Sequence, residues 1–427
     1  MRATLEPGAL WGKIPAPASK SYTHRALCVA YQTHRSYRVV NPLSSDDTLA
    51  TARGLKNLGC RMRIGRGTWK VLPGPGPSQR NVAIDCAASG TTWRLLAALA
   101  ALSPARTVLT GSHRLEERPI APLLRALEQL GADARNESNR EGRATTIRGP
   151  LKGGIASISG GISSQFLSAL LIALPRAASP STIHVVDGLV SAPYVQATLS
   201  VLREAGIRVK VRGSTYRIPG GQRFGGSRFV VPGDASSAAY WWAAAAITGG
   251  SVTVSGIERR WPQADLEILR VLERAGAQVQ VRSNSISVHG PVARGFDADL
   301  TDAPDLYPLL GVVACAVPGG RSYLRGASHA AAKESDRRKG TASLVKALGG
   351  HPGWIHRGST LQISGAYRLR PIRLAGLVDH RMVMSAAVGA LAASGPSTLS
   401  DASCVAKSYP GFWKDLQRLG GRLEVEP

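Results

Sequence analysis

A motif that repeats six times constrains the fold of this chain of 427 residues more than any other sequence feature. In each copy, a short stretch rich in Ser, Thr or Asp leads into a helix rich in Ala and Leu. The copies recur about every 70 residues, and their openings lie at Lys20, Ser89, Ser163, Asp234, Ala303 and Asp379. This regularity predicts one supersecondary unit that is repeated six times along the chain.

A second marker recurs in phase with the first. In each repeat, an amphipathic helix is predicted to end at a glycine, because Gly just past a helix readily adopts the left-handed cap. A strand with period-two alternation then follows, as at 208–211 and 278–281. The six glycines are Gly59, Gly131, Gly206, Gly276, Gly349 and Gly420. Each repeat is therefore predicted to run strand, apolar helix, strand, amphipathic helix, and further strands.

The first helix of each repeat is apolar on nearly every face, as at 235–247. Such a helix must be buried, so the strands are expected to form sheets around the helices. The chain is also too long for one compact core. We predict an α/β (α+β) fold, a two-domain inside-out α/β barrel with three βαβαββ-type repeats per domain and buried parallel helices. The N-terminal domain is predicted to span 14–229, and the C-terminal domain to combine 1–13 with 230–427.

The composition is that of an ordinary globular protein, with 44% hydrophobic and 19% charged residues. No apolar run reaches the roughly 20 residues of a membrane-spanning helix, and the start of the chain lacks the apolar core of a signal peptide. The cysteines show neither metal-ligand spacing nor a disulfide framework; they are Cys28, Cys60, Cys86, Cys315 and Cys404. We therefore expect a cytoplasmic protein with no metal site and no membrane association.

The net charge is strongly positive, +25 at pH 7. Such a charge indicates an anionic partner, either nucleic acid or a phosphorylated metabolite. The basic residues are dispersed and form no tail, and aromatic residues make up only 5% of the chain, so stacking platforms for single strands are not expected. We expect small-molecule substrates and no nucleic acid. Salt-dependent binding of RNA or DNA would instead support a nucleic-acid-binding protein.

The openings of the buried helices are candidate anion sites. A helix N-terminus offers unpaired backbone N–H groups and the positive end of the helix dipole. If the buried helices run parallel, their openings converge on a region lined by Lys and Arg. The alternative is that the Ser and Asp residues only cap their helices. Openings that also carry a cation, at Lys20 and Arg381, favour the anion site.

The densest cluster of charge lies at 333–337, where Glu334 stands between the cations Lys333 and Arg337. Such a cluster could bind a polyanion and also move a proton. Two further charged residues are placed to join it, because Asp305 precedes one apolar helix and Arg381 opens another. The alternative is a solvated helix start without a function.

Taken together, the short motifs of the chain resemble those of the EPSP synthase family of enolpyruvyl transferases. They include K-S-Y-T-H-R at 20–25, S-G-T-T-W-R at 89–94, E-R-P-I at 117–120, S-S-Q-F at 163–166, G-D-A-S-S-A at 233–238, K-E-S-D-R at 333–337, D-H-R-M at 379–382 and K-S-Y-P at 407–410. The related UDP-N-acetylglucosamine enolpyruvyl transferases carry a Cys in their reactive loop, and the corresponding stretch at 112–119 has none. The nucleotide-transfer signature of RNA 3′-terminal phosphate cyclases, which use a related architecture, is also absent.

The resemblance implies that the chain transfers the enolpyruvyl group of phosphoenolpyruvate to the 5-hydroxyl of shikimate 3-phosphate and releases phosphate. This reaction belongs to the shikimate pathway, which leads to chorismate and the aromatic amino acids. No cofactor is implied, and we expect a monomer. Two alternatives stay open: a fold relative that uses another acceptor, such as a sugar nucleotide, and a non-catalytic paralogue.

The resemblance also assigns three sets of site residues, matched motif by motif. Shikimate 3-phosphate is expected to contact Lys20, Ser21, Arg25, Ser163, Ser164, Gln165, Ser191, Tyr194, Asp305, His329 and Lys333. Phosphoenolpyruvate is expected to contact Lys20, Gly90, Arg118, Gln165, Arg337, Arg381 and Lys407. The catalytic residues are expected to be Asp305, Glu334, Lys20 and Lys333.

The resemblance gives these catalytic residues distinct roles. Asp305, with or instead of Lys333, is expected to take the proton of the 5-hydroxyl. Glu334 is expected to protonate the methylene carbon and later remove that proton, which requires burial to raise its pKa. Lys20 is expected to stabilise the developing charge. The chain departs from the family at three positions where many members have Asn, namely His24, Ala88 and His329.

Overall fold

A computed structural model describes residues 1–33, 35–73, 79–139 and 142–426, and the chain divides into two compact units. The N-terminal unit comprises 18–232, and the C-terminal unit comprises 1–17 together with 233–427. Both predicted limits of the N-terminal domain, 14 and 229, therefore lie a few residues too early. The reason for the first error is that β2 (Trp11–Pro15) pairs over its whole length with β15 (Ser251–Ser255) of the C-terminal unit.

The described part of the N-terminal unit contains three four-stranded sheets. The first has the order β14 (Arg228–Val230), β3 (Tyr37–Val40), β5 (Thr68–Leu72), β4 (Arg61–Ile64). The second has the order β6 (Val82–Asp85), β7 (Thr107–Thr110), β9 (Gly142–Arg148), β8 (Asp133–Asn139). The third has the order β10 (Gly154–Gly160), β11 (Ser181–Leu189), β13 (Thr215–Ile218), β12 (Lys210–Arg212).

The C-terminal unit has three more four-stranded sheets among its described residues. One has the order β16 (Gln278–Val281), β17 (Ser285–His289), β15, β2. The next has the order β18 (Asp297–Asp299), β19 (Arg321–Arg325), β21 (Thr360–Ser364), β20 (His351–Ile355). The last has the order β22 (Arg373–Leu374), β23 (Ser397–Leu399), β1 (Arg2–Leu5), β24 (Leu423–Glu426).

All six sheets share one pairing pattern, which confirms the predicted α/β fold of six repeats with three in each unit. Each sheet contains one parallel pair and two antiparallel pairs. In two repeats the parallel edge strand is exchanged: β2 precedes the helix of the first repeat but pairs with β15, and β14 precedes the helix of the fourth but pairs with β3. The N-terminal strands thus complete the C-terminal unit.

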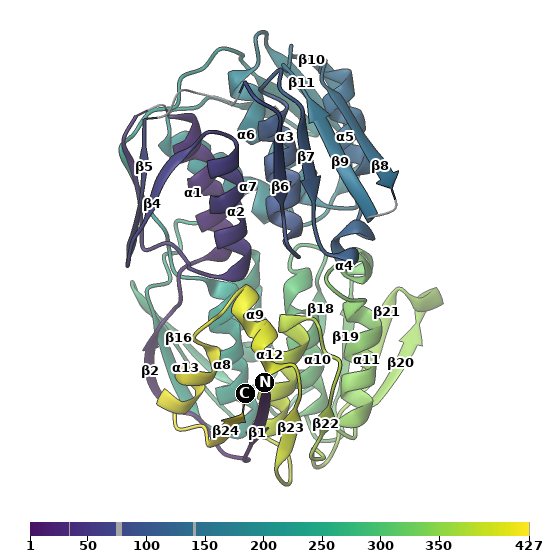
Figure 1. Cartoon of the computed structure of the whole chain (residues 1–427). Helices are drawn as coiled ribbons and strands as arrows, with labels where there is room; N and C mark the ends of the chain where they lie inside the picture. Colours follow the sequence, from purple (N-terminus) through teal and green to yellow (C-terminus); the bar gives the residue numbers. More distant parts are fainter. Residues whose placement is uncertain (34, 74–78, 140–141, 427) are drawn as a thin grey trace. The chain divides into compact units, whose positions relative to one another are not determined.

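The apolar helices form the interior of each unit, as their composition predicts. In the N-terminal unit α1 (Lys20–Gln32), α3 (Gly90–Ala100) and α6 (Ser164–Ala173) contact one another. In the C-terminal unit α8 (Ala235–Thr248), α10 (Tyr307–Cys315) and α12 (His380–Leu391), labelled in Figure 1, do the same. Every residue of α10 and α12 is buried. The many alanines let these helices pack closely, and Trp241 and Trp242 fill the remaining space at 0% exposure.

The amphipathic helices close the repeats and end as predicted. They are α2 (Asp46–Asn57), α5 (Ala121–Gln129), α7 (Ala192–Glu204), α9 (Glu267–Arg274), α11 (Arg337–Ala347) and α13 (Phe412–Arg418), with a short α4 (His113–Glu116) before α5. Each of the six glycines predicted from the repeat has a positive φ, between 74° at Gly206 and 109° at Gly276. Such values strain any other residue, so these glycines terminate their helices.

Short 3-10 turns connect several of these elements. Three of them bear on the site, namely η3 (Pro304–Leu306), η4 (Ser328–Ala332) and η6 (Ala402–Lys407). The others are η1 (Leu174–Arg176), η2 (Ala264–Leu266) and η5 (His356–Gly358). Within the part of the chain that the structure describes, no helix has both the length and the apolar character that crossing a bilayer requires.

Candidate active site

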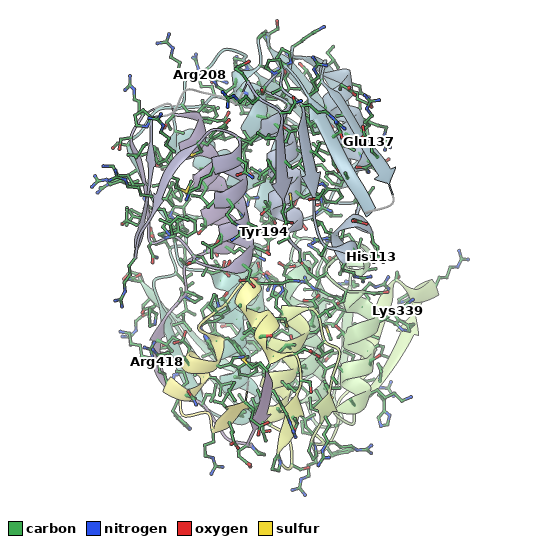
Figure 2. The ribbon with its side chains drawn as sticks, viewed as in Figure 1. His113, Glu137, Tyr194, Arg208, Lys339 and Arg418 are labelled. Atoms are coloured by element: carbon green, nitrogen blue, oxygen red, sulfur yellow. The ribbon has the colours of Figure 1, made fainter. Side chains whose placement is uncertain are left out.

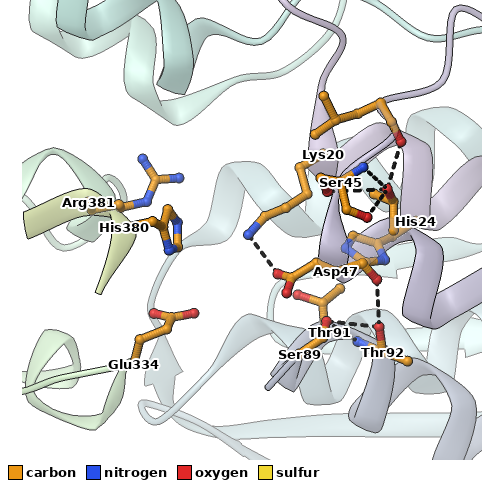
Figure 3. A network of polar contacts seen from close by, with 12 residues as sticks. Lys20, His24, Ser45, Asp47, Ser89, Thr91, Thr92, Glu334, His380 and Arg381 are labelled. Carbon is orange, nitrogen blue, oxygen red and sulfur yellow. Dashed lines mark hydrogen bonds and ion pairs between the residues drawn. The ribbon is translucent and has the colours of Figure 1, made fainter. Parts of the chain in front are cut away.

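The predicted site residues of the N-terminal unit gather at the starts of its inner helices. Lys20 is the first residue of α1, and its Nζ donates a hydrogen bond to Asp47 Oδ2 at 2.9 Å (Figure 3). Asp47 lies in the first turn of α2, and its side chain is only 8% exposed. The ammonium of Lys20 is therefore held by a largely buried carboxylate rather than extended into solvent.

Gly90 and Arg118 fit together at the start of α3. Gly90 is the first residue of the helix, and a Cβ at this position would stand 2.6 Å from Arg118 Cζ. Only a glycine leaves room for this guanidinium, which lies over the helix opening and is 8% exposed. The arrangement places a fixed cation beside a helix N-terminus, which is where an anionic ligand is favoured.

Arg94 connects this opening to Gln165 in the first turn of α6. Its Nη1 donates to Gln165 Oε1 at 2.7 Å, while its Nε and Nη2 donate to the carbonyl of Pro119 at 3.2 and 2.7 Å. Gln165 in turn donates from Nε2 to Thr91 Oγ1 at 3.1 Å. One buried guanidinium thus fixes both Gln165 and the turn that carries Arg118.

Arg25 connects α1 to α7 through hydrogen bonds of its guanidinium. Its Nη1 donates to the carbonyl of Ser21 at 2.9 Å, and its Nη2 donates to the carbonyl of Tyr194 at 3.0 Å. Its Nε donates to Thr198 Oγ1 at 2.8 Å. Thr198 lies on the same helix, α7, as Tyr194, which is labelled in Figure 2. Ser191 is buried at the N-cap of α7, with a left-handed φ of 55°. The contacts bring Ser21, Arg25, Ser191 and Tyr194 together at the openings of two helices.

Ser163 and Ser164 occupy the opening of α6. The hydroxyl of Ser163 caps the helix, because it accepts a hydrogen bond from the backbone N–H of Gln165 at 3.3 Å. Ser164 is buried as the first helical residue. The capping interpretation is therefore correct for Ser163, and its position beside Gln165 still places its hydroxyl at the helix opening.

The C-terminal unit holds a second cluster, centred on Arg337. This side chain is 1% exposed and binds three carboxylates. Its Nη1 donates to Asp305 at 2.6 Å, its Nη2 to Glu334 at 2.7 Å, and its Nε to Asp379 at 2.8 Å. The prediction placed Glu334 between the two cations of its own segment and expected Asp305 to join them, and the structure adds Asp379 from the opening of α12.

Asp305 forms ion pairs with three cations of this cluster. Its second carboxylate oxygen lies 2.8 Å from Arg381 Nη2, and Lys333 Nζ lies 3.7 Å from the first. Burial alone would raise the pKa of Asp305, but Arg381, Lys333 and Arg337 outweigh it and hold this pKa well below its usual value. The carboxylate is therefore ionised but a weak base.

Asp379 fixes the geometry of the cluster. Its carboxylate accepts hydrogen bonds from Ser335 Oγ at 3.0 Å and from the backbone N–H of Arg381 at 2.9 Å, in addition to Arg337. Burial opposes its ionisation, but the charge of Arg337 lowers its pKa below the usual value. Asp379 thus caps α12 at the turn that carries Arg381, and it orients the guanidinium of Arg337, which is predicted to bind phosphoenolpyruvate.

The remaining predicted residues of the C-terminal unit lie around this cluster. His329 is buried in η4, where burial first and Lys333 second lower its pKa to about 4, so it is neutral near pH 7. Lys407 ends η6, which packs against α12. It forms no ion pair with the residues that the structure describes, so the cluster includes Asp305, Lys333, Glu334, Arg337 and Arg381 but not Lys407.

Three residues of the site were not predicted, and each left some signal in the sequence. Asp47 follows Ser45 at the start of an amphipathic helix, which reads as a cap rather than as a partner for Lys20. Arg94 stands four residues after Gly90, on the same face of α3. Asp379 precedes His380 and Arg381 in a charged helix opening. Only the tertiary partners of these residues, which are far away in sequence, distinguish them from ordinary caps and surface charges.

Comparison with known proteins gives consistent matches along the chain. The family model described as EPSP synthase (3-phosphoshikimate 1-carboxyvinyltransferase) matches residues 5–416. The chain is 39% identical over 430 residues to the 3-phosphoshikimate 1-carboxyvinyltransferase of Methanocella arvoryzae, with 100% of both chains covered. It is 36% identical to that of Methanocorpusculum labreanum, again with full coverage. A solved structure of EPSP synthase from Acinetobacter baumannii superposes with a TM-score of 0.81 at 25% identity and covers 100% of both chains.

Proposed function

We propose that this chain, which belongs to the EPSP synthase (3-phosphoshikimate 1-carboxyvinyltransferase) family, transfers the enolpyruvyl group of phosphoenolpyruvate to the 5-hydroxyl of shikimate 3-phosphate. The products are 5-enolpyruvylshikimate 3-phosphate and inorganic phosphate. The family match over residues 5–416 carries this proposal, and it agrees with the resemblance drawn from the motifs. The reaction then belongs to the shikimate pathway in the cytoplasm, where the five free thiols stay reduced.

The clusters of the two units suit the charges of these substrates. Each substrate carries a carboxylate and a phosphate, and Arg binds such groups through two parallel hydrogen bonds. We assign Lys20, Gly90 and Arg118, with Gln165, to phosphoenolpyruvate in the N-terminal unit. We assign Ser21, Arg25, Ser163, Ser164, Ser191 and Tyr194 to shikimate 3-phosphate, since they share the neighbouring helix openings.

The C-terminal cluster supplies the acid and base chemistry. The 5-hydroxyl oxygen attacks the central carbon of phosphoenolpyruvate, its proton passes to Asp305 or Lys333, and Glu334 protonates the methylene carbon. The resulting tetrahedral intermediate loses phosphate when the new methyl group returns one proton to Glu334, and the proton taken from the 5-hydroxyl passes from Asp305 or Lys333 to the departing phosphate. Each proton therefore has a donor and an acceptor within the ion-pair network around Arg337.

The ion pairs of Asp305 suggest how substrate binding activates this residue. Arg337 and Arg381 already hold carboxylates, and the carboxylate of phosphoenolpyruvate can replace Asp305 on these guanidiniums. That exchange would separate Asp305 from two of the cations that depress its pKa. The pKa of Asp305 would then rise, and the carboxylate would become a stronger base when its substrate arrives.

Phosphate release from phosphoenolpyruvate tests this function. We expect phosphate to appear only when shikimate 3-phosphate is present, in an amount equal to the enolpyruvyl product. Phosphate release that requires a sugar nucleotide and ignores shikimate 3-phosphate would support the alternative acceptor. If no phosphate is released with either acceptor, the proposal is wrong and the chain is a non-catalytic paralogue.

A further inference from the structure

His24 is buried where three helices of the N-terminal unit meet. It lies one turn after Lys20 on α1, and its side chain is 0% exposed. Its Nδ1 lies 2.7 Å from Thr51 Oγ1 on α2. A buried imidazole of this kind either only fills space in the core or holds other residues through hydrogen bonds, and its hydrogen-bond partners distinguish the two roles.

The contact with Thr51 begins a chain of hydroxyl groups that crosses to α3. Thr51 Oγ1 lies 2.7 Å from Thr92 Oγ1. Thr92 Oγ1 donates to the backbone carbonyl of Asp47 at 3.1 Å (Figure 3). Thr92 also contacts Ser89 Oγ at 2.8 Å, at the N-cap of α3. The chain therefore ends on the residue whose carboxylate holds Lys20, and beside the helix opening that begins at Gly90.

The direction of these hydrogen bonds follows from the other ring nitrogen. His24 Nε2 is buried and has no hydrogen-bond partner among the described residues. A buried N–H without an acceptor costs more than an unused acceptor, so the proton belongs on Nδ1. His24 then donates to Thr51, Thr51 donates to Thr92, and Thr92 donates to the carbonyl of Asp47. Because Thr92 has a single hydroxyl proton, Ser89 Oγ then donates to Thr92 Oγ1, which accepts from both Thr51 and Ser89.

We propose that His24 is a positioning residue that, through Thr51 and Thr92, holds Asp47 and thereby the ammonium of Lys20 against the opening of α3. This inference rests on the proposed function, in which Lys20 binds phosphoenolpyruvate. The side chain of Lys20 has four rotatable bonds, and a fixed carboxylate restricts where its charge lies. Without the N–H of His24, the hydroxyl of Thr51 loses its donor, and α2 loses one hydrogen bond to α1.

Four variants test the inference, with kcat and KM for phosphoenolpyruvate measured in the full chain by phosphate release. We expect His24→Leu, which has no donor, to lower kcat/KM for phosphoenolpyruvate about 10-fold, the effect of one lost buried hydrogen bond. His24→Asn, whose amide N–H can reach Thr51, should recover most of this loss. Thr51→Val should match His24→Leu, and the double variant should be no worse than either single variant, because both remove the same chain.

A matched control is available in the same unit. His184 on β11 also contacts a threonine, with Nδ1 3.2 Å from Thr215 Oγ1 on β13, and this pair is not part of the hydroxyl chain from His24 to Asp47. His184→Leu should leave kcat/KM unchanged. All variants are compared at a temperature at which circular dichroism shows them fully folded. If His24→Leu lowers only the melting temperature, or if Asn fails to restore kcat/KM, His24 has a packing role and the inference is wrong.

Nitrogen-15 NMR of the imidazole tests the hydrogen bond without any substrate. We expect the proton of His24 on Nδ1, and a change in the carbonyl carbon shift of Asp47 in His24→Leu that is absent in His184→Leu. A proton on Nε2 would overturn the inference even if the enzyme is active. If the unmodified chain releases no phosphate, the proposed function fails, while the NMR result still decides whether His24 holds Asp47.

Discussion

At the residue scale, one missing carbon atom at Gly90 decides where a cation lies. The guanidinium of Arg118 occupies the space that any side chain at this position would need. We predict that Gly90→Ala displaces Arg118 and raises KM for phosphoenolpyruvate about 10-fold, with a smaller effect on kcat, because a binding contact is lost. Gly8→Ala is the control, since nothing lies within 4 Å of a Cβ at Gly8. An unchanged KM in Gly90→Ala would show that Arg118 does not bind this substrate.

Glu334 allows binding and chemistry to be separated. Its carboxylate faces Arg337, and an amide of the same shape can still accept that hydrogen bond. Glu334→Gln should therefore leave KM for both substrates largely unchanged and reduce kcat by about 10²–10⁴-fold, the usual contribution of a general acid. The predicted increase of its pKa remains a prediction. Turnover close to that of the unmodified chain would remove Glu334 from the mechanism.

The burial of His24 makes folding sensitive to acid. Burial, with Lys20 and Arg25 nearby, lowers the pKa of His24 well below 6.5. Below about pH 6.5 the unfolded chain binds a proton that the folded chain excludes, so stability falls as pH decreases. His24 contributes at most about 1.4 kcal/mol per pH unit to this slope. His24→Asn should reduce the slope between pH 6.5 and 5, measured by denaturant unfolding, and an equal slope in both proteins would contradict the buried neutral imidazole.

At the scale of elements, the first sheet of the N-terminal unit carries a row of like charges. Arg228, Arg38, Lys70 and Arg63 stand opposite one another across four adjacent strands, and all are exposed. These strands contain no acidic residue, whereas Arg325 on β19 of another sheet pairs with Asp297 at 3.0 Å. Like charges directly opposite one another destabilise a sheet.

Replacing the central charge of this row should stabilise the protein. Arg38→Glu converts the contacts with Arg228 and Lys70 into opposite-charge pairs, so we predict a gain of about 0.5–1 kcal/mol in the free energy of unfolding. Arg38→Gln should give a smaller gain. Both gains should shrink in high salt, which screens surface charges. A loss of stability in Arg38→Glu at low salt would show that the row is not repulsive.

Most elements could be predicted because their signals are local. The glycine that ends each amphipathic helix and the apolar character of each inner helix are visible in any short window of sequence. The strand at 278–281 was predicted correctly as β16. The strand predicted at 208–211 begins two residues later than predicted, because β12 begins at Lys210. At Arg208 the side chain of Gln222 makes the hydrogen bonds that a neighbouring strand would make. Its Oε1 accepts from the backbone N–H of Arg208 at 2.9 Å, and its Nε2 donates to the carbonyl of Arg208 at 3.1 Å.

At the scale of the whole molecule, the order of the repeats does not fully determine which strands pair. Strands β2 and β14 precede equivalent helices, yet each joins the sheet of the other unit. The predicted domain limits already placed residues 1–13 in the C-terminal domain, but no one-dimensional pattern indicates that β14 pairs with β3. The motifs identified the residues around Arg337, but the pairings of Lys20 with Asp47 and of Arg94 with Gln165 join positions 27 and 71 residues apart. Such pairings depend on tertiary packing.

One measurement tests the central claim that this chain transfers an enolpyruvyl group by addition and elimination. The chain is incubated in D₂O with phosphoenolpyruvate and shikimate 3-phosphate, and the products are followed by proton NMR. The intermediate has a methyl group that gains a deuteron from solvent, so we predict an enolpyruvyl ether at the 5-position with deuterium in its vinyl group. An ether without deuterium, or no ether at all, would contradict the account.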